Sequence, residues 1–161
     1  MYKFETKMLT KYTQNLPYLF KNEYSDIKKM HSEKNKNLYK CKSLKNSNEY
    51  VIKQYIIDDK EEYLELENVP PILTKIEVIE SSKIVKYYQF HNRNISSNIH
   101  EICLVSEKCH STLHEDMHIL GKKRHFNFDN VLDIIQDCMD GVKACHNAQL
   151  VYLGLHPKNI V

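Results

Sequence analysis

The chain closes with the stretch His146-Asn-Ala-Gln-Leu-Val-Tyr-Leu-Gly-Leu-His-Pro-Lys-Asn-Ile-Val161, and this stretch guides the interpretation of everything before it. It begins where a long amphipathic pattern stops. Gly154 and Pro157 predict a short loop, and Asn159 to Val161 predict entry into a strand. A loop held at both ends by packed elements is a common place for functional side chains. We therefore expect this segment to present polar groups from a fixed loop.

The amphipathic pattern that precedes this loop predicts a helix from about Asp129 to Asn147, capped by Asn127 or Asp129. Its apolar positions follow the i, i+3, i+4, i+7 rule of a helix that packs along one stripe. They are Val131, Ile134, Ile135, Cys138, Met139, Val142 and Cys145.

The first half of the chain has the alternation of an antiparallel sheet rather than of helices. Between Tyr24 and about Lys53 we expect two or three strands, including 38–42 and 50–55 around a turn at 45–48. Further along, the pattern predicts a short helix at 72–80, a strand at 84–90 and a polar turn at 92–98. A second strand at 101–106 and a short helix at 110–120 follow. Five strands with one helix before the fourth, followed by helices, predict an α+β fold.

Composition limits the function classes. The chain has 161 residues, a length that suits one domain with a core that buries about 70% of the unfolded surface. Its 23 Lys and Arg against 21 Asp and Glu give a formal charge of +2, and the scattered lysines do not predict a nucleic-acid partner. No apolar run is long enough for a membrane span. Five cysteines without a signal segment predict an intracellular, cytoplasmic protein with reduced thiols.

The closing stretch resembles the catalytic loop of eukaryotic protein kinases, whose pattern is H-R-D-L-K-P-x-N-I-L. The matching residues are His146, at the position of a further upstream His, and Leu155, Pro157, Asn159 and Ile160. The residues that differ are Tyr152, Leu153, Gly154 and His156, which stand where the family has His, Arg, Asp and Lys. Gly154 thus takes the place of the catalytic carboxylate.

Other segments resemble kinase motifs in the same order. Tyr50 to Lys53 is similar to V-A-I-K, which implies that Lys53 pairs with nucleotide phosphates and that Val51 lies over adenine. Residues 104–109 resemble the fifth strand and hinge, where the backbone at Glu107 and Cys109 would hold adenine, with Ser106 as gatekeeper.

The resemblance implies a division into three parts. Residues 1–23 would be an N-terminal extension and residues 24–106 a kinase-like N-lobe, with a five-stranded antiparallel sheet and one helix. Residues 107–161 would form the hinge and the first helices of an incomplete helical C-lobe.

The chain departs from the family wherever nucleotide chemistry is done. It has no glycine before Gly121, and the counterpart of the phosphate loop carries His31, Glu33 and Lys36 at the glycine positions. Val51 replaces a smaller alanine, and no D-F-G segment follows Asn159, a vestigial magnesium ligand. We expect a pseudokinase, with ATP and magnesium binding weak or absent. A fragment of a longer ATP-binding Ser/Thr-type kinase is the alternative.

A second alternative is a zinc-dependent hydrolase. His114-Glu115-Asp-Met-His118 fits the H-E-x-x-H motif, in which two imidazoles bind zinc and the glutamate acts as general base. The continuation to Gly121 and His125 resembles the metzincin pattern with the third histidine one residue late. Asp116 opposes this interpretation, because the corresponding helix is normally buried.

The predicted helix 129–147 carries apolar residues over too much of its circumference for a helix with one face in water. We therefore expect a protein partner, a missing C-terminal region or self-association to cover it. A non-catalytic module that binds a protein through the kinase-like surface is a third interpretation of the same fold.

Overall fold

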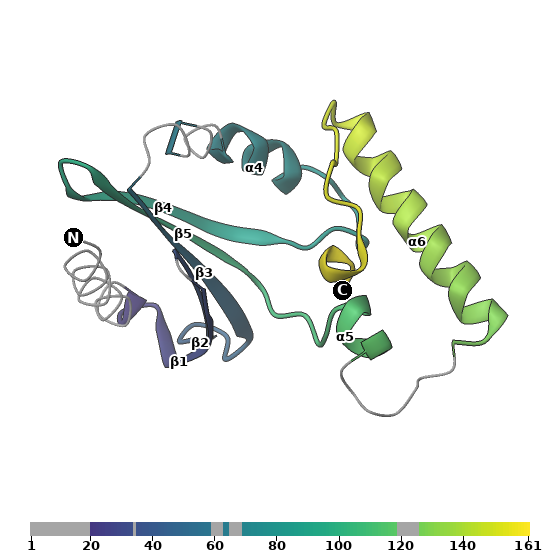
Figure 1. Cartoon of the computed structure of the whole chain (residues 1–161), viewed down its shortest axis with the longest axis horizontal. Coiled ribbons are helices and arrows are strands. Elements are labelled where there is room, and N and C mark those ends of the chain that lie inside the picture. Colours follow the sequence, from purple (N-terminus) through teal and green to yellow (C-terminus); the bar gives the residue numbers. More distant parts are fainter. Residues whose placement is uncertain (1–19, 34, 59–62, 65–68, 119–125) are drawn as a thin grey trace, which may run out of the picture. The chain divides into compact units, whose positions relative to one another are not determined.

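A computed structural model describes residues 20–33, 35–58, 63–64, 69–118 and 126–161. It is α+β, with a five-stranded antiparallel sheet and few helices, as the sequence predicted (Figure 1). The chain divides into two compact units. The first comprises Met1–Pro70 and Tyr87–Lys108, and the second comprises Pro71–Lys86 and Cys109–Val161. The domain boundary that we expected from the sequence at residue 106 lies close to the end of the first unit at Lys108. Residues 71–86, however, group with the helical unit.

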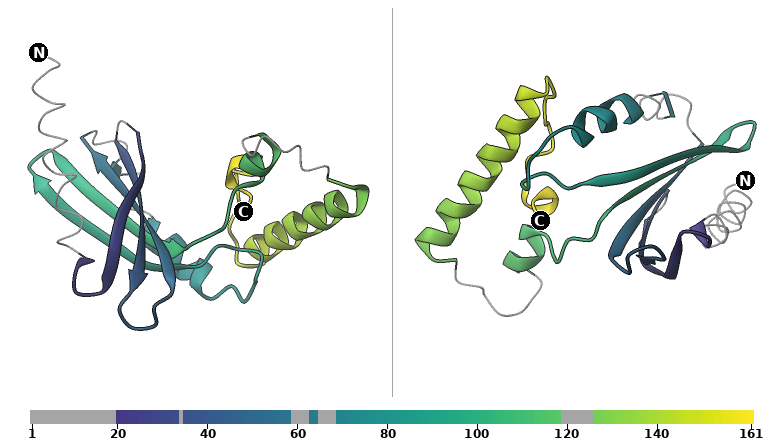
Figure 2. Two further views of the ribbon diagram at one scale, coloured as in Figure 1. Left: turned by 90° about the horizontal axis from the view of Figure 1, so that it is seen from below. Right: turned by 180° about the vertical axis from the view of Figure 1, so that it is seen from behind.

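The sheet belongs to the first unit and has the strand order β1-β2-β3-β5-β4, with visible twist (Figure 2). The strands are β1 (Tyr24–Ser32), β2 (Lys36–Ser43), β3 (Glu49–Ile57), β4 (Tyr87–Ser96) and β5 (Ile99–Glu107). Residues 101–106 of β5 are buried without alternation, as expected of a strand covered on both faces. The alternating pattern of β2 instead buries Asn37, Tyr39 and Cys41.

One face of the sheet carries a hydrophobic core. Its members come from the residues before β1 and from four strands: Phe20, Tyr24, Tyr39, Cys41, Ile52, Cys103 and Val105. Phe20 is only 1% exposed, and its ring lies edge-on to Tyr24 and His91 at centroid distances of 5.9 and 5.0 Å. The segment 1–23 therefore contributes to the core at Phe20, and residues 1–19 of the expected extension lie outside the described residues.

A chain of polar side chains crosses all five strands. Ser32 Oγ donates to Asn37 Oδ1 at 2.7 Å, and Asn37 Nδ2 donates to Gln54 Oε1 at 2.9 Å. Gln54 Nε2 donates to Glu101 Oε1 at 2.6 Å, and the guanidinium of Arg93 on β4 donates to the other oxygen of Glu101. Asn37, Gln54 and Glu101 are each at most 3% exposed. Their hydrogen bonds therefore replace those that water would make.

The structure corrects two expectations for the fourth strand. The strand expected at 84–90 begins at Tyr87, and the polar turn expected at 92–98 is wrong, because residues 92–96 continue β4. The turn to β5 falls at Ser97 and Asn98. Polar residues suggested a turn here, but alternate positions of this edge strand face outward, where polar side chains are tolerated.

The remaining described elements are α4 (Val69–Glu77), α5 (Leu113–His118), α6 (Phe128–Asn147) and the 3₁₀ helix η1 (Pro157–Asn159). α4 begins earlier than the predicted 72–80, since prolines fit the first helical turn. The prediction for α6 is confirmed to within one residue, and its N-cap is Asn127, whose side chain accepts from the Asn130 amide. Within the described part of the chain, no helix combines the length and the apolar character that crossing a membrane requires.

The strand entry expected at 159–161 is wrong. Pro157 instead starts η1, and the His156 side chain caps it by accepting from the Lys158 amide. The carbonyl oxygen of Ile160 accepts from the Leu113 amide at 2.8 Å, which fixes the end of this segment to α5 rather than to a strand.

We predict that Arg93→Ala lowers the free energy of unfolding by about 3 kcal/mol, because it leaves the buried carboxylate of Glu101 without its cation. Chemical denaturation measures this. Lys42→Ala is the matched control: it removes an exposed ion pair with Asp26, 3.8 Å apart, and should change stability by less than about 1 kcal/mol. Equal effects of the two variants would contradict a structural role for the polar chain.

Candidate functional site

Val51, Lys53 and Ser106, three of the residues expected near nucleotide, lie on one face of the sheet, opposite the hydrophobic core. Val51 pairs with Ser106 across β3 and β5, and Lys53 pairs with Leu104 two positions along. Directly opposite residues of antiparallel strands share a face. The fold therefore brings Val51, Lys53 and Ser106 together, and it places Ile52 in the core on the other face.

Lys53 is half-buried, and its ammonium lies 5.6 Å from the centroid of the Tyr87 ring. Among the described residues, no carboxylate lies within ion-pair distance of Lys53. An ammonium over an aromatic ring gains modest stabilisation from the ring quadrupole. A lysine on this surface can attract an anion, but it does not by itself build a phosphate site.

The residues that the resemblance placed at a phosphate loop lie at and beside the turn between β1 and β2. His31 Nε2 lies 3.2 Å from Glu33 Oε1, and both side chains are exposed. The Glu33 amide donates to the carbonyl oxygen of Lys36, so the turn closes on itself through its backbone. A carboxylate at this point repels a polyphosphate, and the Glu33 amide, already bonded to Lys36, is not available to one.

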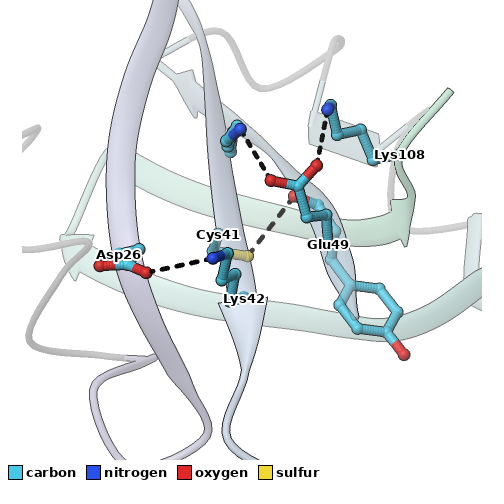
Figure 3. Close-up of polar contacts among 7 residues, drawn as sticks. Asp26, Cys41, Lys42, Glu49 and Lys108 are labelled. Carbon is cyan, nitrogen blue, oxygen red and sulfur yellow. Dashed lines mark hydrogen bonds and ion pairs between the residues drawn. The ribbon is translucent and has the colours of Figure 1, made fainter. Parts of the chain in front are cut away.

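A carboxylate on β3 joins the end of β5, where the resemblance placed a hinge, to β2. Glu49, the first residue of β3, lies 2.7 Å from Lys108 Nζ through one oxygen and 2.7 Å from Lys40 Nζ through the other (Figure 3). Hydrogen bonds from Lys108 and then from Lys40 lower the pKa of Glu49 to about 2. Lys108 lies between Glu107 and Cys109, so this clamp fixes the strand end whose backbone was expected to hold adenine.

Sequence reasoning missed this clamp. Glu49 follows a turn and resembles any solvated residue there, and only the register between β2 and β3 brings it near Lys40. The lysine-rich strand β2 was the available signal, because a carboxylate on the neighbouring strand can reach a lysine two positions from its direct partner.

The clamp predicts how stability depends on pH. Since the folded pKa of Glu49 lies below its unfolded value, its contribution is complete above about pH 4.5 and is lost as the pH falls toward 2. We expect denaturation midpoints of the wild type and Glu49→Gln to converge between pH 5 and about pH 2. A difference that stays constant over this range would mean that the ion pairs add nothing.

The closing loop is held by its own side chains. Asn159 Nδ2 donates to the carbonyl oxygen of Gly154 at 2.9 Å. A Cβ at Gly154 would lie 3.0 Å from that same nitrogen and 3.4 Å from the Tyr152 ring. The position where the family places a carboxylate is therefore crowded by Asn159 and Tyr152. Gly154 and Asn159 lie close together, as the motif requires, and the Asn159 side chain is hydrogen-bonded to the Gly154 backbone.

The zinc motif forms the short helix α5, with the His114 and His118 rings 4.8 Å apart. Glu115 accepts from the Thr112 amide at 2.8 Å, and Thr112 Oγ1 accepts from the Glu115 amide at 3.1 Å. This reciprocal pair is a capping box, so the expected general base serves as a helix cap. In the described segments, no group of three or more His, Cys, Asp or Glu could hold a metal, and His125 lies outside them.

We predict that the purified protein carries well under one zinc per chain by elemental analysis. Among the described residues the motif brings together two imidazoles and no third protein ligand, whereas catalytic zinc sites use three. Glu115→Gln should leave any residual zinc unchanged. One zinc per chain, with proteolysis that Glu115→Gln abolishes, would instead support the hydrolase.

The second unit contains an open apolar groove of about 780 Å³ along α6. Its walls come from α5, α6 and the closing loop: Leu113, Met117, Phe126, Val131, Ile134, Ile135, Cys138, Met139, Val142, Lys143, His146, Leu155 and Ile160. Val131, Leu132, Ile135 and Met139 are between 40% and 61% exposed. Such a contiguous apolar surface marks an interaction site in most folded proteins.

No family model matches the chain, and no curated protein matches it either. Function must therefore be argued from the residues of the site, since a fold alone does not determine it.

Proposed function

We propose that this chain is a kinase-like domain with degenerate ATP-binding and catalytic loops, acting as a pseudokinase without phosphoryl transfer. The observation that carries the proposal is the loop at Gly154, where Asn159 and Tyr152 fill the position of the missing carboxylate. That carboxylate accepts the proton of the attacking hydroxyl in a working kinase. Without this carboxylate, the loop lacks the group that would accept the proton.

The face of the sheet supports the resemblance. Val51, Lys53 and Ser106 share one face because β3 and β5 pair in the register that joins Val51 to Ser106. The five-stranded antiparallel sheet, with α4 between β3 and β4 along the chain, agrees with the elements that the motifs implied. These features support a kinase-like fold for the chain.

Nucleotide and magnesium do not fit this site well. The turn beside the face presents Glu33, and Lys53 contacts an aromatic ring rather than a carboxylate. Asn159 could offer magnesium only a neutral amide oxygen, whereas magnesium is normally bound by carboxylates together with phosphates. ATP would therefore bind weakly or not at all.

We predict that 1 mM ATP with magnesium stabilises the protein by less than about 0.4 kcal/mol, as expected for a dissociation constant of 1 mM or above. Thermal denaturation with and without nucleotide measures this. Lys53→Ala is the control and should respond identically. A stabilisation above about 2.7 kcal/mol that Lys53→Ala removes would contradict weak binding.

Phosphoryl transfer is tested separately with radiolabelled ATP. We expect no incorporation by the wild type. Gly154→Asp alone should not restore phosphate incorporation, because the added side chain meets Asn159. The turn at Glu33 also still lacks a phosphate site. Incorporation that Lys53→Ala abolishes would show an active kinase.

A further inference from the structure

The hairpin formed by β1 and β2 concentrates positive charge. Residues 28–45 contain seven lysines and a single carboxylate, that of Glu33, which gives this segment a formal charge of +6. The whole chain has a formal charge of only +2, so the remaining residues together are acidic. Charge is therefore segregated onto one hairpin of the sheet, and a surface with such an excess of one sign attracts polyions of the other.

The register of the sheet places lysines from three strands on one face. Lys28 lies directly opposite Lys40 across β1 and β2, and Lys40 lies directly opposite Val51 on β3. Directly opposite residues share a face, so these lysines lie on the side of the sheet away from the hydrophobic core. Alternate positions along β2 and β3 share that side. This surface, the basic face, comprises Lys28, Lys36, Lys40, Lys42 and Lys53.

Two lysines of the basic face are already paired with carboxylates. Glu49 lies 2.7 Å from Lys40 Nζ, and Asp26 lies 3.8 Å from Lys42 Nζ. Within the described ranges, no carboxylate lies within ion-pair distance of the other three: Lys28, Lys36 and Lys53. An anionic ligand can pair with these three ammonium groups without first displacing a carboxylate.

The chemistry of the basic face favours phosphate over carboxylate as its ligand. All five cations are lysines, and none is an arginine, whose planar fork matches a carboxylate through two hydrogen bonds. Lysine instead acts as a point charge and commonly binds phosphate. A nucleic-acid strand presents a regular row of phosphates, and lysines on three neighbouring strands can contact several of them at once.

Aromatic rings beside the lysines favour a single strand over a duplex. The Lys36 ammonium lies 5.7 Å from the centroid of the Tyr55 ring, and the Lys53 ammonium lies 5.6 Å from that of Tyr87. Tyr55 is the direct partner of Lys36, and Tyr87 pairs with Ser106, so both half-buried rings belong to the same side of the sheet. Proteins that bind single strands combine a basic track with aromatic rings on which unpaired bases stack.

We propose that the basic face binds the phosphate backbone of single-stranded nucleic acid. Contacts to phosphate fix the strand without reading its sequence, so binding is independent of sequence. Glu33 repels phosphates at the tip of the hairpin, but Lys36 leans away from the tip toward Tyr55 on β3. The proposal uses only the register of the sheet and the positions of its lysines, so it does not depend on the kinase resemblance.

Fluorescence anisotropy of a labelled single strand of about 20 thymidines tests binding to the full chain. We expect a Kd on the order of 10 µM at 50 mM salt. Three phosphate contacts predict a slope of about −2 for the logarithm of affinity against that of salt concentration, which is an about twentyfold loss between 50 and 200 mM. Absence of binding at 100 µM protein in 50 mM salt, or a slope near zero, would overturn the proposal.

Lys28→Ala and Lys29→Ala are a matched pair of variants. The two lysines are neighbours and both are exposed, but Lys29 pairs with Tyr39 and lies on the core side of the sheet. Lys28→Ala should weaken binding about eightfold at 50 mM salt and make the salt slope shallower by about 0.7. Lys29→Ala should change affinity by less than about twofold, since its charge lies off the track. Equal effects of the two variants would show that the basic face is not the binding surface.

A duplex of the same length and vesicles that contain phosphatidylserine distinguish other sources of anionic charge. We expect the single strand to bind at least about fivefold more tightly than the duplex, because only unpaired bases can stack on the tyrosines. Tyr87→Leu should remove this preference and leave the salt slope unchanged, since it removes no charge. Tighter binding to the duplex or to the vesicles would refute the assignment to a single strand.

Discussion

The buried carboxylate of Glu101 is the constraint on which the sheet depends. It is 1% exposed and bonded on one side to Gln54 and on the other to Arg93, which is 38% exposed and keeps access to water. Removing a carboxylate from water is favourable only where its partners are in place. A one-residue slip of β3 or β4 would turn Gln54 or Arg93 to the opposite face and leave this charge unpaired. The polar chain therefore specifies the register more than it adds stability.

The proposed loss of nucleotide chemistry from a persisting fold is compatible with a separation of roles between the two faces of the sheet. The polar chain and the hydrophobic core occupy one face, and Val51, Lys53 and Ser106 share the other. Substitutions on the second face leave the register untouched. In the proposed pseudokinase, the glycine-free turn at Glu33 and the contact of Lys53 with Tyr87 would alter ligand binding without changing which strands pair.

The sequence predicted those parts that depend on local periodicity. The pattern of α6 located it to within one residue, since its apolar spacing and its cap at Asn127 are both local signals. The strands β2 and β3 were equally visible around their turn.

What the sequence could not predict depends on register or on competing partners. Glu101 and Gln54 resemble the outward residues of half-buried strands until pairing shows that they face each other. The clamp at Glu49 requires the offset between β2 and β3. At Asn159, a strand was expected from composition alone, but Pro157 and the His156 cap favour a 3₁₀ turn. The sequence identified the candidate site residues only as motif positions. It could not predict the contacts of Lys53 with Tyr87 and of Gly154 with Tyr152.

The groove exists because only one side of α6 is held. Lys83 bonds Asp137 at 2.6 Å, and its carbonyl oxygen lies 3.2 Å from where a Cβ at Gly141 would be. A Cβ there would be in tight contact with that oxygen, so glycine lets the 81–86 segment approach the helix closely. The contact explains why residues 71–86 belong to the helical unit. It covers the Gly141 side of α6, so the unsatisfied apolar surface is concentrated on the side of Ile135. The apolar surface that stays exposed is therefore confined to one side of the helix.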